Sequence, residues 1–151
     1  MVVLEFPPPD FRIRTHAQQE QIFDPFRRRW VRLTPEEWVR QNMLQYLVAV
    51  QQYPAALIGV EKEIQVGNLK KRFDILVYNR NHAPWMLIEC KAMDVVVNNA
   101  VLHQAIRYHQ AAPATFLVIT NGTQTRVWEK KAQQLHELSA LPPYPVISEG
   151  A

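Results

Sequence analysis

The sequence predicts a single α/β domain in which helices flank a mixed β-sheet and a β-hairpin extends from the N-terminus. Segments with helix and strand composition follow one another in the order helix, three strands, helix, two strands. The chain has 151 residues, of which 48% are hydrophobic, so it can bury one core and leaves little room for a second. We expect the core of the domain at residues 34–130, an arm and hairpin at residues 1–33, and a surface tail at residues 131–151.

Composition excludes several classes of protein. The 17 Lys and Arg residues exceed the 14 Asp and Glu residues by only +3, which permits a polyanionic partner without requiring one. Cys90 is the single cysteine, so an intramolecular disulfide and a cysteine zinc cluster are excluded. No apolar run approaches the roughly 18 residues of a membrane span, and no signal-like stretch opens the chain. We expect a soluble, cytoplasmic protein without a membrane partner.

The N-terminal third predicts an extended arm, a hairpin and the first helix. Pro7, Pro8 and Pro9 lack backbone donors, and residues 11–15 and 22–33 alternate apolar and basic residues around a turn at Asp24. Thr34 is a suitable N-cap, and Glu37 stands three residues later, as in a capping box. The helix should run to about residue 52.

The remaining elements are separated by turn residues. Strand patterns occur at residues 58–66, 72–78 and 85–90, with Gly67-Asn68 between the first two, which indicates an antiparallel meander. A helical segment at residues 99–111 ends before Pro113. The apolar run at residues 115–120 predicts a strand buried on both faces, which turns at Asn121-Gly122 into a last strand at residues 125–129.

Asp74 and Glu89 interrupt strands that are otherwise built for burial, and such charges need a partner. Because strand side chains alternate, Glu89 and Lys91 project from one face, and pairing with the preceding strand can bring Asp74 beside them. Two neighbouring carboxylates repel one another unless they share a cation, and oxygen ligands suit Mg²⁺ or Mn²⁺. A lysine can orient a water or stabilise charge on a phosphate, so the set predicts phosphodiester hydrolysis.

A structural interpretation competes with this one. Asp74 and Glu89 can simply form ion pairs with Lys91, Arg72 or Lys71 at the edge of the sheet. The same Glu-x-Lys spacing occurs at Glu129, where it runs into a polar stretch with no paired acidic strand before it. The strand pattern alone favours neither interpretation.

Three segments resemble the PD-(D/E)xK nuclease domain at the N-terminus of type I restriction enzyme R subunits. They are Arg72-Phe73-Asp74, Ile88-Glu89-Cys90-Lys91-Ala92 and Gln104-Ala105-Ile106-Arg107-Tyr108, and the resemblance extends over about residues 34–128. That family carries a Gln-x-x-x-Tyr motif on the helix after the Glu-x-Lys strand, where Gln104 and Tyr108 stand here. Phe73 occupies the position that gives the family name its proline.

The resemblance implies a restriction-endonuclease-like fold and DNA cleavage dependent on Mg²⁺ or Mn²⁺. The implied catalytic residues are Asp74, Glu89 and Lys91, and the Cys90 carbonyl is a further metal ligand. Glu37 is an additional candidate ligand, although the capping box already explains it. No Gly-x-x-x-x-Gly-Lys-Ser/Thr motif occurs, so ATP-driven translocation would require a separate motor protein.

Several residues are candidates for contact with substrate. Gln104 and Tyr108 are four residues apart on one helix face, although ordinary helix packing also explains Tyr108. The basic run Lys70, Lys71, Arg72 and a second run at residues 27–29 predict a rim that grips phosphates, unless they are merely solvated. The expected partner is nucleic acid, most simply DNA. The protein could act on it as a homodimer, and a separate motor or repair protein could be a further partner. The alternatives are a catalytically inactive nucleic-acid-binding module of the same fold and a purely structural domain.

Overall fold

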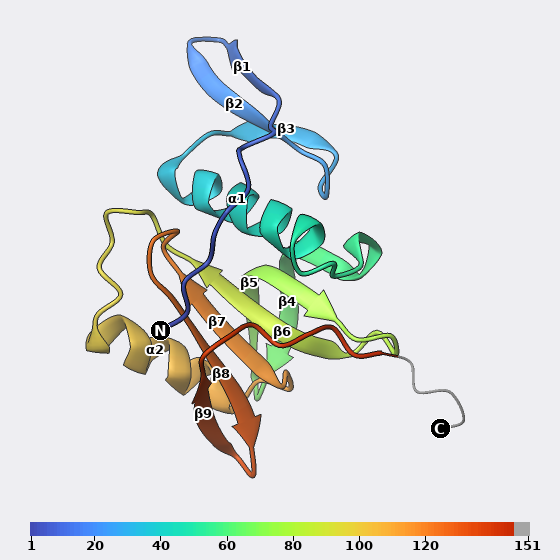
Figure 1. Ribbon diagram of the computed structural model, residues 1–151, viewed down its shortest axis with the longest axis vertical. Helices are drawn as coiled ribbons and strands as arrows, with labels where there is room; N and C mark the ends of the chain where they lie inside the picture. Colours follow the sequence, from blue (N-terminus) through green and yellow to red (C-terminus); the bar gives the residue numbers. More distant parts are fainter. Residues whose placement is uncertain (147–151) are drawn as a thin grey trace.

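The computed structural model describes residues 1–146 and, within them, every side chain except that of Tyr108. Its centre is a six-stranded sheet with the strand order β4-β5-β6-β7-β8-β9 (Figure 1). The strands are β4 (Ile58–Val66), β5 (Leu69–Tyr78), β6 (Pro84–Cys90), β7 (Phe116–Thr120), β8 (Thr125–Lys131) and β9 (Gln134–Leu138). Strands β6 and β7 run parallel, while the other neighbouring pairs run antiparallel. The predicted mixed α/β sheet is therefore confirmed.

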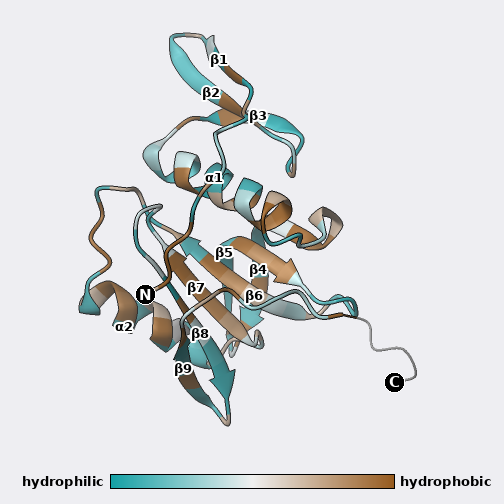
Figure 2. Cartoon of the chain, viewed as in Figure 1, coloured by the Kyte–Doolittle hydropathy of each residue, from teal (hydrophilic) through white to brown (hydrophobic). Residues whose placement is uncertain are grey.

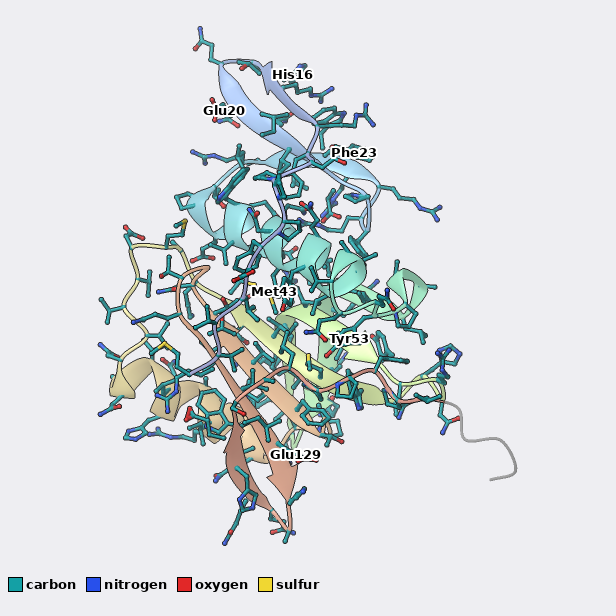
Figure 3. All side chains as sticks on the ribbon, viewed as in Figure 1. His16, Glu20, Phe23, Met43, Tyr53 and Glu129 are labelled. Carbon is teal, nitrogen blue, oxygen red and sulfur yellow. The ribbon has the colours of Figure 1, made fainter. Side chains whose placement is uncertain are left out.

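Two helices cover opposite faces of this sheet. Helix α1 (Pro35–Ala49) packs Val39, Met43 and Leu47 into a core cluster that also holds Ile88 of β6. Met43 points from α1 toward the sheet (Figure 3). Helix α2 (Asn99–Gln110) packs Leu102 against alternate residues of β7 and β8 on the other face. The central strands are largely hydrophobic (Figure 2). Val118 of β7 belongs to the cluster with α1, while Leu117 and Ile119 pack with α2, which explains why β7 reads as a continuous apolar run.

The start of α1 agrees with half of the predicted capping box. The Thr34 hydroxyl accepts a hydrogen bond from the Glu37 N–H at 3.1 Å. The Glu37 carboxylate, in contrast, bonds to Arg40 and Arg27 and not to the N-cap backbone. The helix ends at Ala49, short of the expected residue 52, and a 3₁₀ turn, η1 (Ala55–Leu57), leads into β4.

The N-terminal extension is a sheet of three strands, where a hairpin was the expectation. Strands β1 (Ile13–His16), β2 (Gln19–Asp24) and β3 (Arg29–Arg32) pair antiparallel. The turn after Asp24 is confirmed. A further turn at Ala17 and Gln18 adopts left-handed φ values of 49° and 64°. Helix α1 lies between this small sheet and the main sheet (Figure 1).

The prediction of a surface tail at residues 131–151 is wrong for the first part of that segment. Strand β8 continues to Lys131, and β9 pairs with it along its whole length. Leu141 is buried, and the Tyr144 hydroxyl donates to the Tyr78 carbonyl at 2.8 Å. Strand β9, Leu141 and Tyr144 are therefore held on the domain. Neither helix of the described residues is long and apolar enough to cross a lipid bilayer.

Candidate active site

Asp74 and Glu89 stand at neighbouring positions of two paired strands. Ile75 of β5 pairs with Ile88 of β6, so Asp74 and Glu89 are the next residues toward the same end of the antiparallel pair. Both side chains are partly buried there. The structure thus brings the two carboxylates together at the edge of the core.

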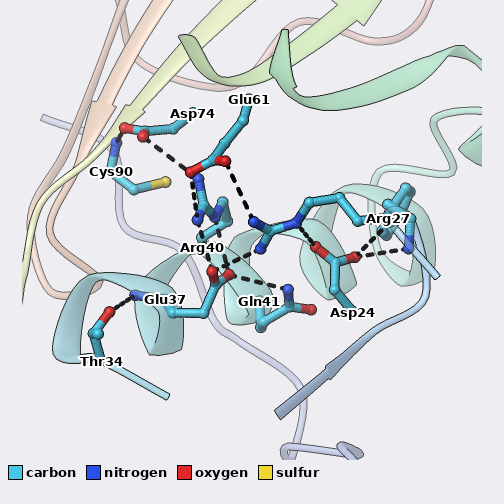
Figure 4. A network of polar contacts seen from close by, with 10 residues as sticks. Asp24, Arg27, Thr34, Glu37, Arg40, Gln41, Glu61, Asp74 and Cys90 are labelled. Atoms are coloured by element: carbon cyan, nitrogen blue, oxygen red, sulfur yellow. Dashed lines mark hydrogen bonds and ion pairs between the residues drawn. The ribbon is translucent and has the colours of Figure 1, made fainter. Parts of the chain in front are cut away.

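Asp74 is held by one backbone donor and faces one guanidinium. Its Oδ2 accepts a hydrogen bond from the Cys90 N–H at 2.7 Å, and its Oδ1 lies 3.6 Å from Nη1 of Arg40 (Figure 4). Burial raises the pKa of Asp74 above its usual value, although the Cys90 hydrogen bond and the Arg40 charge act in the opposite direction. The carboxylate is fixed in place, but its charge is not fully compensated.

The charge of Glu89 is compensated less than that of Asp74. Its Oε1 is buried and has no hydrogen-bond partner among the described residues, and Nζ of Lys71 lies 3.8 Å from it. Burial, and then the charge of Asp74, raise the pKa of Glu89, while Lys71 and Lys91 oppose the shift. Burial also lowers the pKa of Lys71, since it removes water from the ammonium. The ion pair with Lys71 foreseen by the structural interpretation is present, but it is too long to be a hydrogen bond.

Lys91 completes the group on the same face of β6. Ile88 and Cys90 belong to the core cluster beneath α1, so Glu89 and Lys91 alternate to the other face. The Lys91 N–H donates to the Thr120 carbonyl at 2.8 Å, which keeps the backbone in strand pairing just beyond Cys90. Lys91 itself is half-buried.

These residues can be compared with what a divalent cation needs. The described residues contain no group of three Asp, Glu, His or Cys side chains arranged to hold a metal. Two carboxylates are present, so a cation here would take its other ligands from backbone carbonyls and water, as Mg²⁺ commonly does. The buried Oε1 of Glu89 is an acceptor without a donor, and a cation could supply the missing charge. The site therefore fits a hard, well-hydrated cation and not zinc.

Glu37, the additional candidate ligand, has both oxygens occupied. Its Oε1 accepts from Nη2 of Arg40 and from Nη2 of Arg27, each at 2.6 Å. Its Oε2 accepts from Nε of Arg40 at 2.9 Å and from Nε2 of Gln41 at 3.1 Å. Although burial alone would raise the pKa of Glu37, the bonds from Arg40 and Arg27 lower it to about 2.

The network around Glu37 joins distant parts of the chain (Figure 4). Arg27, from the β2–β3 turn, also pairs with buried Asp24 and approaches Glu61 of β4 at 3.5 Å. Arg40 approaches Glu61 at 3.3 Å and then Asp74. The sequence interpretation missed Arg40, and it assigned Arg27 to a phosphate-gripping rim and not to this buried network. The available signal was the position of Arg40, which follows Glu37 by three residues on a buried helix face.

The predicted phosphate-gripping residues do not form one surface. Arg72 is exposed and pairs with Glu63 at 3.6 Å, and Lys70 is also exposed, whereas Lys71 projects from the opposite face toward Glu89. Gln104 is exposed on α2. Tyr108 lies in α2, but its side chain is outside the described part of the structure.

A comparison with known families places the chain in one of them. The family model described as type I restriction enzyme R protein N terminus matches residues 35–142, which is most of the chain. The matched region includes α1, the six strands and α2. A search of curated proteins finds no match. The chain therefore belongs to the family of type I restriction enzyme R protein N termini, a nuclease-like domain.

Proposed function

We propose that this protein hydrolyses phosphodiester bonds in DNA with the help of Mg²⁺ or Mn²⁺, and that Asp74, Glu89 and Lys91 form its active site. The observation that carries the proposal is the buried Oε1 of Glu89, which has no hydrogen-bond partner among the described residues and lies beside a second carboxylate. A purely structural ion pair would be expected to satisfy that oxygen. Membership of a restriction enzyme family supports the same chemistry.

Asp74 and Glu89 would hold the cation, with the Cys90 carbonyl as a further ligand. When bound, such a cation polarises a phosphoryl oxygen and lowers the pKa of a bound water. The chain contributes rigidity, because the Cys90 N–H fixes Oδ2 of Asp74 before any ligand arrives. The cation would also offset the effects of burial and of the Asp74 charge, which together raise the pKa of Glu89.

The two lysines have different tasks. Lys91 shares a face with Glu89, so its ammonium is placed to orient the attacking water or to stabilise charge on the phosphate. Lys71 balances part of the Glu89 charge in the metal-free protein, since its Nζ lies 3.8 Å from Oε1. With a cation bound at Glu89, Lys71 could contact a phosphate oxygen of the substrate.

Glu37 and Arg40 act as positioning residues. Because four donors already saturate the Glu37 carboxylate, we assign it to orienting Arg40 and not to the metal. Arg40 in turn faces Oδ1 of Asp74 at 3.6 Å and limits the rotation of that carboxylate. Their substitution should therefore weaken cation binding without removing a ligand.

Gln104, Tyr108, Lys70 and Arg72 remain proposed substrate contacts around this site. We propose that the protein acts in the cytoplasm, and that a homodimer cuts both strands of a duplex, since each active site cuts one strand. Any translocation along DNA would depend on a separate motor or repair protein.

The test is Mg²⁺ and Mn²⁺ titration by calorimetry, run beside cleavage of plasmid and single-stranded DNA. Asp74→Asn and Glu89→Gln should lose both cation binding and cleavage. Glu63→Gln is the matched control, because Glu63 is an exposed strand carboxylate paired with Arg72, and it should retain both. Cation binding without cleavage in the wild-type protein would favour the inactive nucleic-acid-binding module. Absence of cation binding would overturn the proposed metal site.

A further inference from the structure

The outer face of the N-terminal sheet is basic and aromatic. The strand register places Arg14, Gln21 and Arg32 in one row across β1, β2 and β3. The next row contains the Phe23–Trp30 pair, and the Phe23 N–H donates to the carbonyl of Arg12 at 2.9 Å. The tip and the base of this sheet are marked by His16 and Phe23 (Figure 3).

The arginines of this face are held by aromatic rings. The Arg14 guanidinium carbon lies 4.2 Å from the centre of the Trp30 ring, and that of Arg12 lies 4.7 Å from the centre of the Phe23 ring. Trp30 and Phe23 themselves contact edge to face, with 5.5 Å between their ring centres. Arg14 also donates through Nε to Oε1 of Gln21 at 2.8 Å. Guanidinium groups stacked in this way lose less freedom when they bind an anion.

Within the three strands, no carboxylate shares this face, and the acidic residue beside it is Asp10, which lines the same hollow as Arg12 and Phe23. The acidic residues of the three strands, Glu20 and Asp24, alternate to the opposite side together with Ile22. Ile22 and Asp24 are fully buried, and Asp24 pairs with Arg27, so that side faces the interior. The outer face therefore carries exposed positive charge that no acidic residue of the three strands neutralises.

We propose that this outer face binds the sugar-phosphate backbone of a nucleic acid. Arg12, Arg14 and Arg32 are exposed, and Arg14 and Arg32 lie two strands apart, about 10 Å in a β-sheet. A regularly charged backbone can meet such an array without an apolar pocket, and arginine forks match phosphate geometry. The choice of nucleic acid as the polyanion rests on the proposed function, whereas the surface itself lies outside the matched residues 35–142.

The position of the sheet makes the binding useful for catalysis. Arg27 leaves the β2–β3 turn and bonds to Glu37, which holds Arg40 against Asp74. The outer face is thereby tied to the active site through a chain of buried ion pairs. A nucleic-acid strand bound on this face would be held at a fixed orientation to the carboxylates of Asp74 and Glu89.

The test measures binding of fluorescein-labelled duplex and single-stranded DNA by anisotropy in EDTA, over a series of salt concentrations. The double variant Arg14→Gln/Arg32→Gln should weaken binding on the order of tenfold near physiological salt. The slope of log Kd against log salt should fall by about 1.8 for a duplex or about 1.4 for a single strand. Arg14→Lys/Arg32→Lys keeps the charge and should retain most of the salt dependence.

The matched control is Arg80→Gln/Lys131→Gln, which removes the same charge elsewhere. Arg80 lies in the turn before β6, and Lys131 is exposed at the end of β8. Equal losses in both double variants, unchanged binding in Arg14→Gln/Arg32→Gln, or no binding by the wild type would each overturn the inference. Binding in EDTA does not depend on a bound cation, so failure of the metal site and failure of this surface are distinguishable.

Discussion

Replacement of Glu37 by glutamine tests whether the buried ion network stabilises the fold. Glu37 is only 4% exposed, and its two oxygens accept from Arg27, Arg40 and Gln41. Glutamine has nearly the same shape, but its amide group would face a guanidinium donor, so at least one buried hydrogen bond becomes a clash of donors. The two arginines would also lose the carboxylate that they share.

The pKa of Glu37 gives the magnitude of the stabilisation that the substitution should remove. Hydrogen bonds from Arg40 and Arg27 outweigh burial and lower this pKa from 4.5 to about 2. Each pKa unit corresponds to about 1.4 kcal/mol, so the charged form of Glu37 stabilises the folded state by about 3 kcal/mol. The folded pKa is lower than the unfolded one. This stability is therefore present above pH 4.5 and is lost as the pH falls toward 2.

Urea unfolding followed by tryptophan fluorescence, at several pH values between 7 and 3, measures the effect. Glu37→Gln should lose about 3 kcal/mol at pH 7, and its difference from the wild type should shrink below pH 4.5. Glu137→Gln is the control, because Glu137 forms a surface pair with Arg126, and it should lose less than about 1 kcal/mol. A Glu37→Gln loss below about 1 kcal/mol at pH 7, or one that stays constant to pH 3, would refute the reasoning.

Three further predictions follow from burial, capping and the site. Leu117→Ala removes a side chain that is 1% exposed beneath α2 and should cost about 2–5 kcal/mol in urea unfolding, whereas a loss below about 1 kcal/mol would mean that the contact with α2 is loose. Thr34→Ala removes the N-cap acceptor and should cost about 1 kcal/mol by the same measurement, with Thr34→Ser restoring most of it. Glu89→Gln removes the charge from a buried oxygen without a hydrogen-bond partner, so it should raise the melting temperature of the metal-free protein. It should also abolish the increase in melting temperature that we expect Mg²⁺ to give the wild type. A lower melting temperature without metal would contradict the last prediction.

The main sheet was predictable because its turns carry strong local signals. Gly67 adopts a φ of 60° between β4 and β5, and Gly122 adopts a φ of 91° between β7 and β8. Glycine tolerates this left-handed region at little cost, so both turns are visible in the sequence. Between them, the apolar strand patterns are long enough to fix the order of elements.

The β1–β2 and β8–β9 hairpins were not predicted, for the same physical reason. The turns at Ala17-Gln18 and Ala132-Gln133 both use left-handed φ values, and neither contains glycine, asparagine or aspartate. Local preferences disfavour such residues there, so the strand pairing on either side must stabilise the turn. That pairing is non-local, which explains why β9 and the first hairpin turn were not predicted.

In the candidate site, too, features set by local sequence rules were predicted, and features set by tertiary packing were not. Alternation along β6 and the pairing of β5 with β6 are short-range rules, and they were enough to place Glu89, Lys91 and Asp74 near one another. The ion pairs of Arg27 depend on how the N-terminal sheet packs on α1, which no local pattern specifies. The capping-box pattern was correct for the Thr34 hydroxyl only, since two arginines compete successfully for the Glu37 carboxylate.

Glu37 and Glu89 show why the two carboxylates should have different roles. Both are largely buried, but Glu37 has four donors and a lowered pKa, whereas Glu89 has a buried oxygen without a hydrogen-bond partner and a raised pKa. The surroundings of Glu37 stabilise its charge without any ligand, so a cation would have to displace guanidinium groups to bind there. The surroundings of Glu89 leave its charge unfavourable, and under the proposed function a bound cation would offset that charge. Keeping this unfavourable charge beside Asp74 lowers the stability of the folded domain, and a function in cation binding would explain why the charge is kept.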